Sequence, residues 1–180
     1  TFADIVILQH FVYCKLINHF EPRRLEYSSL RFITPEKLNV FSEAERKSMN
    51  YILMTKRGRW KLTYNSYKTS RTYGVQTFDV PPGFKTTLKK IERIFSTRVP
   101  AGWLFFSRNN RPLSHSSFSK FVKDLFQTYV GKKWTQNTIR SIRVSALFKD
   151  APPTKQLLAT QEGMGSNLAT LNLNYRVPQK

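Results

Sequence analysis

The 180-residue chain has few of the residues that build metal sites and disulfides. It contains a single cysteine, Cys14, three histidines and only eleven acidic residues. One cysteine excludes an internal disulfide and any zinc or iron–sulfur site made of several thiolates. The histidines (His10, His19 and His115) lie far apart and lack the spacing of metal ligands. The sequence therefore predicts no metal site.

Nucleotide-binding, hydrolase and membrane-spanning patterns are also missing. The sequence has no Gly-x-x-x-x-Gly-Lys, Gly-x-Gly-x-x-Gly or Gly-x-Ser-x-Gly segment. Its most apolar stretch, Ile5 to Leu16, is interrupted by Gln9, His10 and Lys15 and is too short to span a bilayer. We therefore expect no cofactor and no membrane partner, and an intracellular location.

Positive charge is abundant. Lys and Arg number 30 against 11 Asp and Glu, which gives a formal net charge of +19. The chain is also 40% hydrophobic and 14% aromatic, which excludes a disordered basic tail and favours a folded domain with its own core. Because this charge is larger than solubility requires, it predicts an anionic polymer as partner, most commonly nucleic acid.

The hydrophobic spacing predicts a mainly α-helical fold with a small antiparallel β-sheet, an α+β class. Residues 1–180 are expected to form a single domain. Helices are predicted over 2–20, 84–95, 114–126, 137–147 and 154–162, and helical turns within 35–56. Strands are predicted over 30–33, 59–64, 73–80 and 103–106, with residues 65–72 forming the exposed basic tip of a hairpin.

Four short segments carry residues suited to phosphate chemistry. Pro22-Arg23-Arg24-Leu25-Glu26 follows the first predicted helix, and Tyr67-Lys68-Thr69 lies in the hairpin. Asn137-Thr138-Ile139-Arg140-Ser141 begins a helix, and Met164-Gly165-Ser166-Asn167 is followed by Tyr175. In this order and on these elements, the segments resemble the catalytic domain of the tyrosine recombinases, or phage-type integrases. The resemblance is nearest to the divergent branch found in eukaryotic mobile elements and large DNA viruses.

The resemblance implies two catalytic arginines that bind the scissile phosphate. The first arginine of the family is followed three residues later by an acidic residue, which matches Arg23 with Glu26 and leaves Arg24 as the alternative. The second corresponds to Arg140, with Arg143 as the alternative. Guanidinium groups suit this task because they bind two phosphate oxygens at once and stay charged at any working pH.

The other implied site residues are Lys68, Asn137, Ser166 and Tyr175. Tyr175 corresponds to the nucleophile, and Lys68 to the hairpin lysine that protonates the departing 5′ oxygen. Asn137 and Ser166 stand where most family members have histidines. Neither side chain acts as a base near neutral pH, although both can hydrogen-bond a phosphoryl oxygen.

The implied function is DNA strand cleavage and rejoining through a covalent 3′-phosphotyrosine, without metal or ATP. The implied partners are double-stranded DNA and further copies of the chain, as a tetramer on paired DNA sites, in the nucleus if the source is a eukaryotic element or a virus. The family's N-terminal DNA-clamping domain is expected to be absent from this chain. The replaced histidines favour an alternative, a catalytically weakened or inactive DNA-binding module derived from a recombinase.

Overall fold

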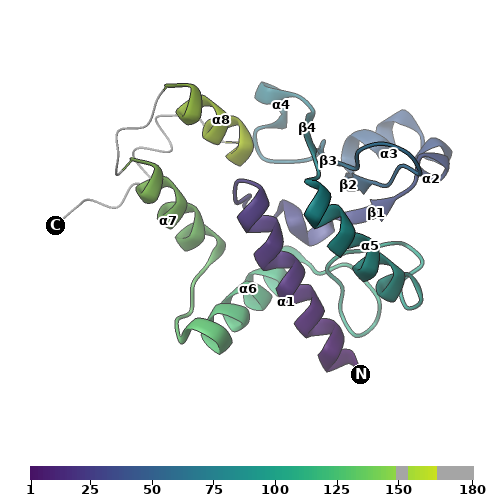
Figure 1. Cartoon of the computed structure of the whole chain (residues 1–180), viewed down its shortest axis with the longest axis horizontal. Helices are drawn as coiled ribbons and strands as arrows, with labels where there is room; N and C mark the ends of the chain where they lie inside the picture. The colour runs from purple at the N-terminus through teal and green to yellow at the C-terminus, as the bar shows by residue number, and fades with distance from the viewer. Residues whose placement is uncertain (149–153, 166–180) are drawn as a thin grey trace.

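The structure, a computed structural model, describes residues 1–148 and 154–165 (Figure 1). In these ranges helices predominate over a four-stranded sheet, which confirms the predicted α+β class. The elements are α1 (Phe2–His19), the 3₁₀ helix η1 (Glu26–Ser29), β1 (Arg31–Ile33), α2 (Pro35–Val40), α3 (Glu43–Ser48), β2 (Asn50–Leu53), β3 (Lys61–Tyr64), α4 (Ser70–Tyr73), β4 (Gln76–Asp79), α5 (Pro82–Ser96), α6 (His115–Val130), α7 (Gln136–Phe148) and α8 (Thr154–Met164).

The first helix, α1, follows directly from its capping residues and hydrophobic repeat. The Thr1 hydroxyl accepts a hydrogen bond from the Asp4 backbone N–H, and the Asp4 carboxylate bonds back to the N-terminal residue, which satisfies donors that a helix start leaves open. Residues spaced by three or four positions are buried along one face: Ile5, Gln9, Val12, Tyr13 and Leu16. Helix α1 ends shortly before Pro22, as predicted.

The sheet is mixed, which corrects the prediction of an antiparallel sheet. Its strand order is β1-β2-β3-β4, with β1 and β2 parallel and the other two pairs antiparallel. Strand β2 lies where only helical turns were predicted, because four residues are too few to show an alternating pattern. Helices α2 and α3 form the connection that a parallel pair requires.

The predicted strand over 103–106 is not a strand of this sheet. The residues Leu104, Phe105 and Phe106 are buried, as expected of a core segment. However, their segment joins β1 only through one isolated bridge between Arg31 and Trp103 and two backbone hydrogen bonds, Phe32 N–H to Gly102 and Leu104 N–H to Leu30. The hydrophobicity of these residues therefore reflects burial and not strand pairing.

The predicted hairpin is formed by β3 and β4, with Tyr64 opposite Gln76 at the end next to its connection. Its connection folds into the helical turn α4, and Gly74 closes this turn with a φ of 65° that favours glycine. Lys68 lies just before α4 and is exposed. The hairpin tip therefore presents Lys68 from a short, ordered turn.

The core lies between α1, α5, α6 and the sheet. Helix α5 begins at the predicted proline pair and buries Phe84, Leu88, Ile91 and Phe95. Helix α6 is capped by the Ser114 side chain and ends at Gly131 in the left-handed conformation. Helices α7 and α8 lie on the side of α1 opposite to α2 and α3 (Figure 1).

Candidate active site

Arg23 is buried beside the sheet, in the segment that leaves α1. Its side chain is only 1% exposed. The guanidinium carbon lies 4.4 Å from the ring centre of Tyr64, 5.1 Å from that of Tyr67 and 5.8 Å from that of Phe78. The electron-rich faces of these rings attract the cation and compensate part of the hydration energy that it loses on burial. Arg23 is therefore held from three sides by aromatic side chains.

A hydrogen-bonded triangle connects Arg23 to β4 and to the end of α8. Arg23 Nη2 donates to Gln76 Oε1, and Gln76 Nε2 donates to the Glu162 carbonyl oxygen at 2.9 Å. Arg23 Nη2 also lies 3.5 Å from the same Glu162 oxygen. Because the side chains of Arg23 and Gln76 are buried, these bonds compensate polar groups that would otherwise be costly to bury. Gln76 therefore fixes the Arg23 side chain relative to α8.

Arg140 lies on α7 and is completely buried. Its Nη1 donates to the Pro22 carbonyl oxygen at 2.7 Å and to the Met164 carbonyl oxygen at 3.3 Å. One turn earlier on α7, Gln136 Nε2 donates to the carbonyl oxygen of Arg23. Helix α7 therefore holds both the segment that carries Arg23 and the segment that ends α8.

Gly165 lies in close contact with Arg23 and the hairpin. The Thr69 hydroxyl donates to the Gly165 carbonyl oxygen at 2.7 Å. The φ of Gly165 is +59°, and a Cβ atom there would lie 2.8 Å from Arg23 Nη1 and 3.2 Å from the Tyr67 ring. Only glycine fits this conformation and this space. The structure therefore brings together parts of the four segments that the sequence singled out.

Arg24, Lys68 and Asn137 meet at an open cavity of about 410 Å³. The other described residues that line it are Leu25, Ser119, Thr135 and Gln136, and none of these seven is acidic. Lys68 comes from the hairpin and Asn137 from the first turn of α7, where backbone N–H groups also favour negative charge. The cavity is therefore suited to an anion.

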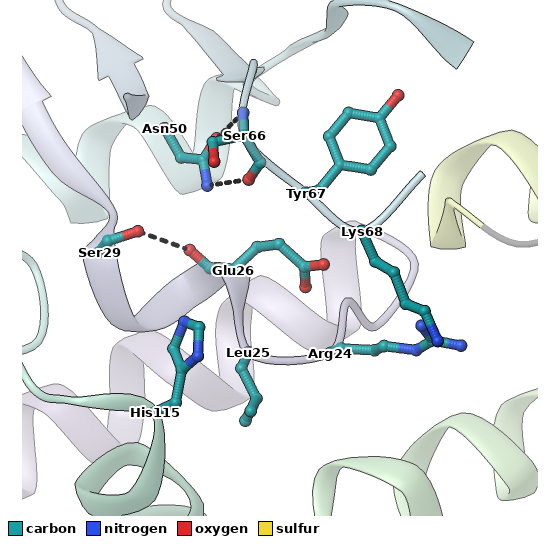
Figure 2. A pocket seen from close by; sticks show the side chains of 9 residues that line it. All are labelled: Arg24, Leu25, Glu26, Ser29, Asn50, Ser66, Tyr67, Lys68 and His115. Atoms are coloured by element: carbon teal, nitrogen blue, oxygen red, sulfur yellow. Dashed lines mark hydrogen bonds between the residues drawn. The ribbon is translucent and has the colours of Figure 1, made fainter. Parts of the chain in front are cut away.

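A second cavity of about 350 Å³ shares Arg24, Leu25 and Lys68 with the first (Figure 2). Figure 2 shows Lys68 and Arg24 reaching the same side of this cavity from two different segments. Glu26 and His115 also line it, and Glu26 Oε2 is buried with no hydrogen-bond partner in the part of the chain that the structure describes. His115 is a residue that sequence reasoning set aside, because its only local feature is its place at the start of α6.

Arg143 lies on α7 outside these two cavities. Its Nε and Nη2 atoms bind the two carboxylate oxygens of Glu21 at 3.0 and 3.1 Å, and this pairing raises the pKa of Arg143. Arg23 and Arg143 line a different cavity of about 210 Å³, together with Glu21 and the end of α1. Arg140 and Arg143 therefore have different surroundings, although they are one turn apart.

Two predicted site residues, Ser166 and Tyr175, lie outside the described residues. In residues 1–148 and 154–165, no group of three or more His, Cys, Asp or Glu side chains is arranged to hold a metal ion. Within the same ranges, no helix combines the length and the apolar character needed to cross a membrane.

Sequence reasoning also missed Gln76 and Gln136, because a buried glutamine leaves no periodic pattern.

Comparison with known proteins shows similarity at the level of the fold. No protein-family model and no curated protein sequence matches the chain. Among solved structures, the crystal structure of XerA recombinase is similar, with a TM-score of 0.57 at 12% sequence identity. The match covers 98% of this chain and 59% of the XerA chain. The fold is therefore that of a recombinase structure, over somewhat more than half of its length.

Proposed function

We propose that the chain cleaves and rejoins DNA strands through a covalent 3′-phosphotyrosine on Tyr175. The observation that carries this proposal is the meeting of parts of four separate segments around Arg23, in a fold similar to that of XerA recombinase. The net charge of +19 supports DNA as the substrate. Arg23, Arg140, Lys68, Asn137, Ser166 and Tyr175 are the proposed site residues.

The buried arginines support the electrostatic part of this chemistry. Arg23 and Arg140 are the two charged side chains that are buried among the described residues. Attack on a phosphodiester builds negative charge on the non-bridging oxygens, and fixed cations stabilise that charge most strongly where water is excluded. Positions held by several hydrogen bonds need no reorganisation as the charge develops.

The proposed reaction exchanges one phosphoester bond for another. The Tyr175 hydroxyl gives its proton to solvent water, and its oxygen attacks the phosphorus atom and forms the phosphotyrosine while the bond from phosphorus to the 5′ oxygen breaks. Lys68 gives a proton to the departing 5′ oxygen. The exposed position of Lys68 at the rim of both cavities supports this role. Attack by a 5′ hydroxyl on the phosphotyrosine reverses the step, so rejoining consumes no nucleotide.

The proposed assembly follows from the same resemblance. Double-stranded DNA is the proposed partner, and recombination requires two DNA sites held by several copies of the chain, as a tetramer. The XerA chain extends beyond the matched part, since this chain covers 59% of it. We therefore propose that a separate DNA-clamping domain completes the grip on DNA, and that the protein works where its DNA is, which is the nucleus if the source is a eukaryotic element or a virus.

A second candidate function is DNA binding without cleavage. Asn137 lines the cationic cavity at a place where the family carries a histidine, and its amide cannot transfer a proton near neutral pH. Ser166 replaces the second histidine. A module that holds DNA would still use the cavity and the net charge, so catalysis has to be measured directly.

A nicked suicide duplex tests the proposal. Such a duplex loses a short strand after cleavage, so the covalent protein–DNA adduct accumulates and is resolved on a denaturing gel. We expect an adduct with the wild-type chain and none with Tyr175→Phe. Tyr129→Phe serves as the matched control, because Tyr129 is 60% exposed on α6 and lines neither cavity. Absence of an adduct on cognate sites, with DNA binding retained, would reject cleavage in favour of the DNA-binding module.

A further inference from the structure

We propose that Gln76 is a positioning residue that holds the buried Arg23 guanidinium without neutralising its charge, and so reserves that charge for a DNA phosphate. This inference rests on the proposed function, in which Arg23 binds the scissile phosphate, and it adds a task for Gln76. Gln76 lies on β4, outside the four segments that the resemblance to recombinases singles out. The property that matters is that its amide is polar but uncharged.

Arg23 is a buried cation without a carboxylate partner. A buried arginine normally pairs with a carboxylate, because an unpaired charge is costly to remove from water. Even the half-exposed Arg143 forms such a pair, with Glu21. Arg23 is only 1% exposed, yet within residues 1–148 and 154–165 it forms no ion pair. No counter-charge in the described part of the chain therefore cancels its charge.

The groups that hold Arg23 are all neutral. Gln76 Oε1 accepts a hydrogen bond from Nη2, and the Glu162 carbonyl oxygen lies 3.5 Å from the same nitrogen. Three aromatic rings surround the guanidinium carbon, with ring centres at 4.4, 5.1 and 5.8 Å. Dipoles and ring faces attract a cation without cancelling its charge. Because water is excluded there, the remaining charge attracts an anion more strongly than it would at the surface.

Two nitrogens of Arg23 still have donors to offer. Nε and Nη1 are buried without a hydrogen-bond partner among the described residues, and Arg23 lines the cavity of about 210 Å³. An unsatisfied buried donor is costly, so a phosphate oxygen that accepts from either nitrogen would recover this cost. Gln76 binds Nη2 and leaves Nε and Nη1 to the phosphate. A guanidinium held in this way needs no reorganisation as charge develops.

Gln76 is itself fixed by its surroundings. Its side chain is 3% exposed, and its residue pairs with Tyr64 in the sheet. Its Nε2 atom donates to the Glu162 carbonyl oxygen at 2.9 Å, so the amide uses one end for Arg23 and the other for α8. Gln76→Glu would keep the acceptor for Arg23 and lose the donor. It would also form an ion pair with Arg23 and cancel the charge that the phosphate needs.

Gln76→Glu and Gln76→Met separate the charge of Arg23 from its orientation. For Gln76→Glu we expect the slope of log DNA affinity against log salt to fall by about 0.9, the value of one phosphate contact. The covalent adduct should form roughly tenfold more slowly or less. Gln76→Met leaves Arg23 charged but unanchored, so we expect a wild-type slope with a severalfold lower affinity. Slopes are measured in the Tyr175→Phe background, where no adduct contributes.

Gln127→Glu is the matched control, because it makes the same change of charge at an exposed position on α6. It should keep the wild-type slope. Thermal unfolding gives the second control. Gln76→Met removes the acceptor for Arg23 and should melt at a lower temperature than Gln76→Glu, which keeps it. A purely structural role would change the melting temperature and leave the slope of a folded variant at the wild-type value.

The outcomes separate this inference from the proposed cleavage. A wild-type slope for folded Gln76→Glu, or an equal fall for Gln127→Glu, would overturn the inference. A wild-type adduct together with either result would retain cleavage and reject the task of Gln76. A lowered slope for Gln76→Glu alone, without any wild-type adduct, would retain that task in DNA binding and reject cleavage. If Gln76→Glu does not fold, Gln76→Met decides alone, and wild-type affinity rejects the inference.

Discussion

The replacement Gly165→Ala tests the close contact between Gly165 and Arg23. Two separate costs follow from the geometry. The φ of +59° places an alanine in the left-handed region, which costs about 1–2 kcal/mol. The new methyl group would lie 2.8 Å from Arg23 Nη1 and 3.2 Å from the Tyr67 ring, and overpacking of this kind costs about 1–3 kcal/mol. The expected total loss is about 2–5 kcal/mol of the free energy of unfolding.

Gly131→Ala isolates the crowding term. Gly131 has a φ of +72°, and an added Cβ there would have nothing within 4 Å. It therefore carries only the conformational cost, about 1–2 kcal/mol. Any gain from a stiffer unfolded chain is the same for both variants, because both replace glycine by alanine. The difference between Gly165→Ala and Gly131→Ala then measures the contact with Arg23.

Urea unfolding followed by far-ultraviolet circular dichroism gives both free energies by linear extrapolation. We expect Gly165→Ala to be less stable than Gly131→Ala by about 1–3 kcal/mol. Equal losses for the two variants would refute the close approach of Gly165 to Arg23. In a double-mutant cycle, Gly165→Ala should cost less stability in the Arg23→Ala background than in the wild type, because Arg23→Ala removes the side chain that the new methyl group meets.

Three further predictions concern buried polar groups. Gln136→Leu leaves the Tyr13 hydroxyl and the Arg23 carbonyl buried without their hydrogen-bond partner, so we expect the free energy of unfolding in urea to fall by about 2–4 kcal/mol. Gln136→Leu should cost less when Tyr13→Phe has already removed the hydroxyl, and full additivity of the two changes would contradict this link. Arg140→Leu should lower the free energy of unfolding by about 2–4 kcal/mol, because Arg140 is completely buried. Arg143→Leu should lower it by less than about 1 kcal/mol, because the Arg143 side chain is 58% exposed. The opposite ranking in urea unfolding would contradict these burial differences. Burial raises the pKa of Tyr27 to about 12, above the value of about 10 in the unfolded chain. The contribution of neutral Tyr27 to stability is therefore complete below about pH 10, and about 3 kcal/mol of unfolding free energy is lost as the pH rises towards 12. Tyr27→Phe should show a smaller loss of unfolding free energy over that pH interval, and an identical loss would count against this assignment.

The helices were predictable because their signals are local. Thr1 and Asp4 mark the start of α1, and the buried residues of α5 repeat at helical spacing after two prolines. Strand β2 could not be predicted in the same way. It is a strand because β1 and β3 pair with it on either side, and those partners are distant in the sequence. The parallel pair with β1 was missed for the same reason.

The candidate site was predictable as segments and not as an arrangement. The motifs located Arg23, the Tyr67-Lys68-Thr69 segment, Arg140 and the Met164–Gly165 step, and parts of these four segments meet in the structure. The motifs could not show that the adjacent residues Arg23 and Arg24 line different cavities, because that depends on the rings that surround Arg23. Gln76 joins two of these segments, and nothing in its own neighbourhood in the sequence indicates this role.

The contacts around Arg23 and Arg140 also determine when in folding the site can form. They join residues that are 118 positions apart for Arg140 and Pro22, 139 for Arg23 and Glu162, and 96 for Thr69 and Gly165. Contacts across such long loops carry the largest closure entropy and form late. A chain emerging from the ribosome can complete its sheet well before α8 exists to hold Arg23. The hydrogen bonds of Arg23 and Arg140 to the end of α8 are thus completed only after α8 has been synthesised.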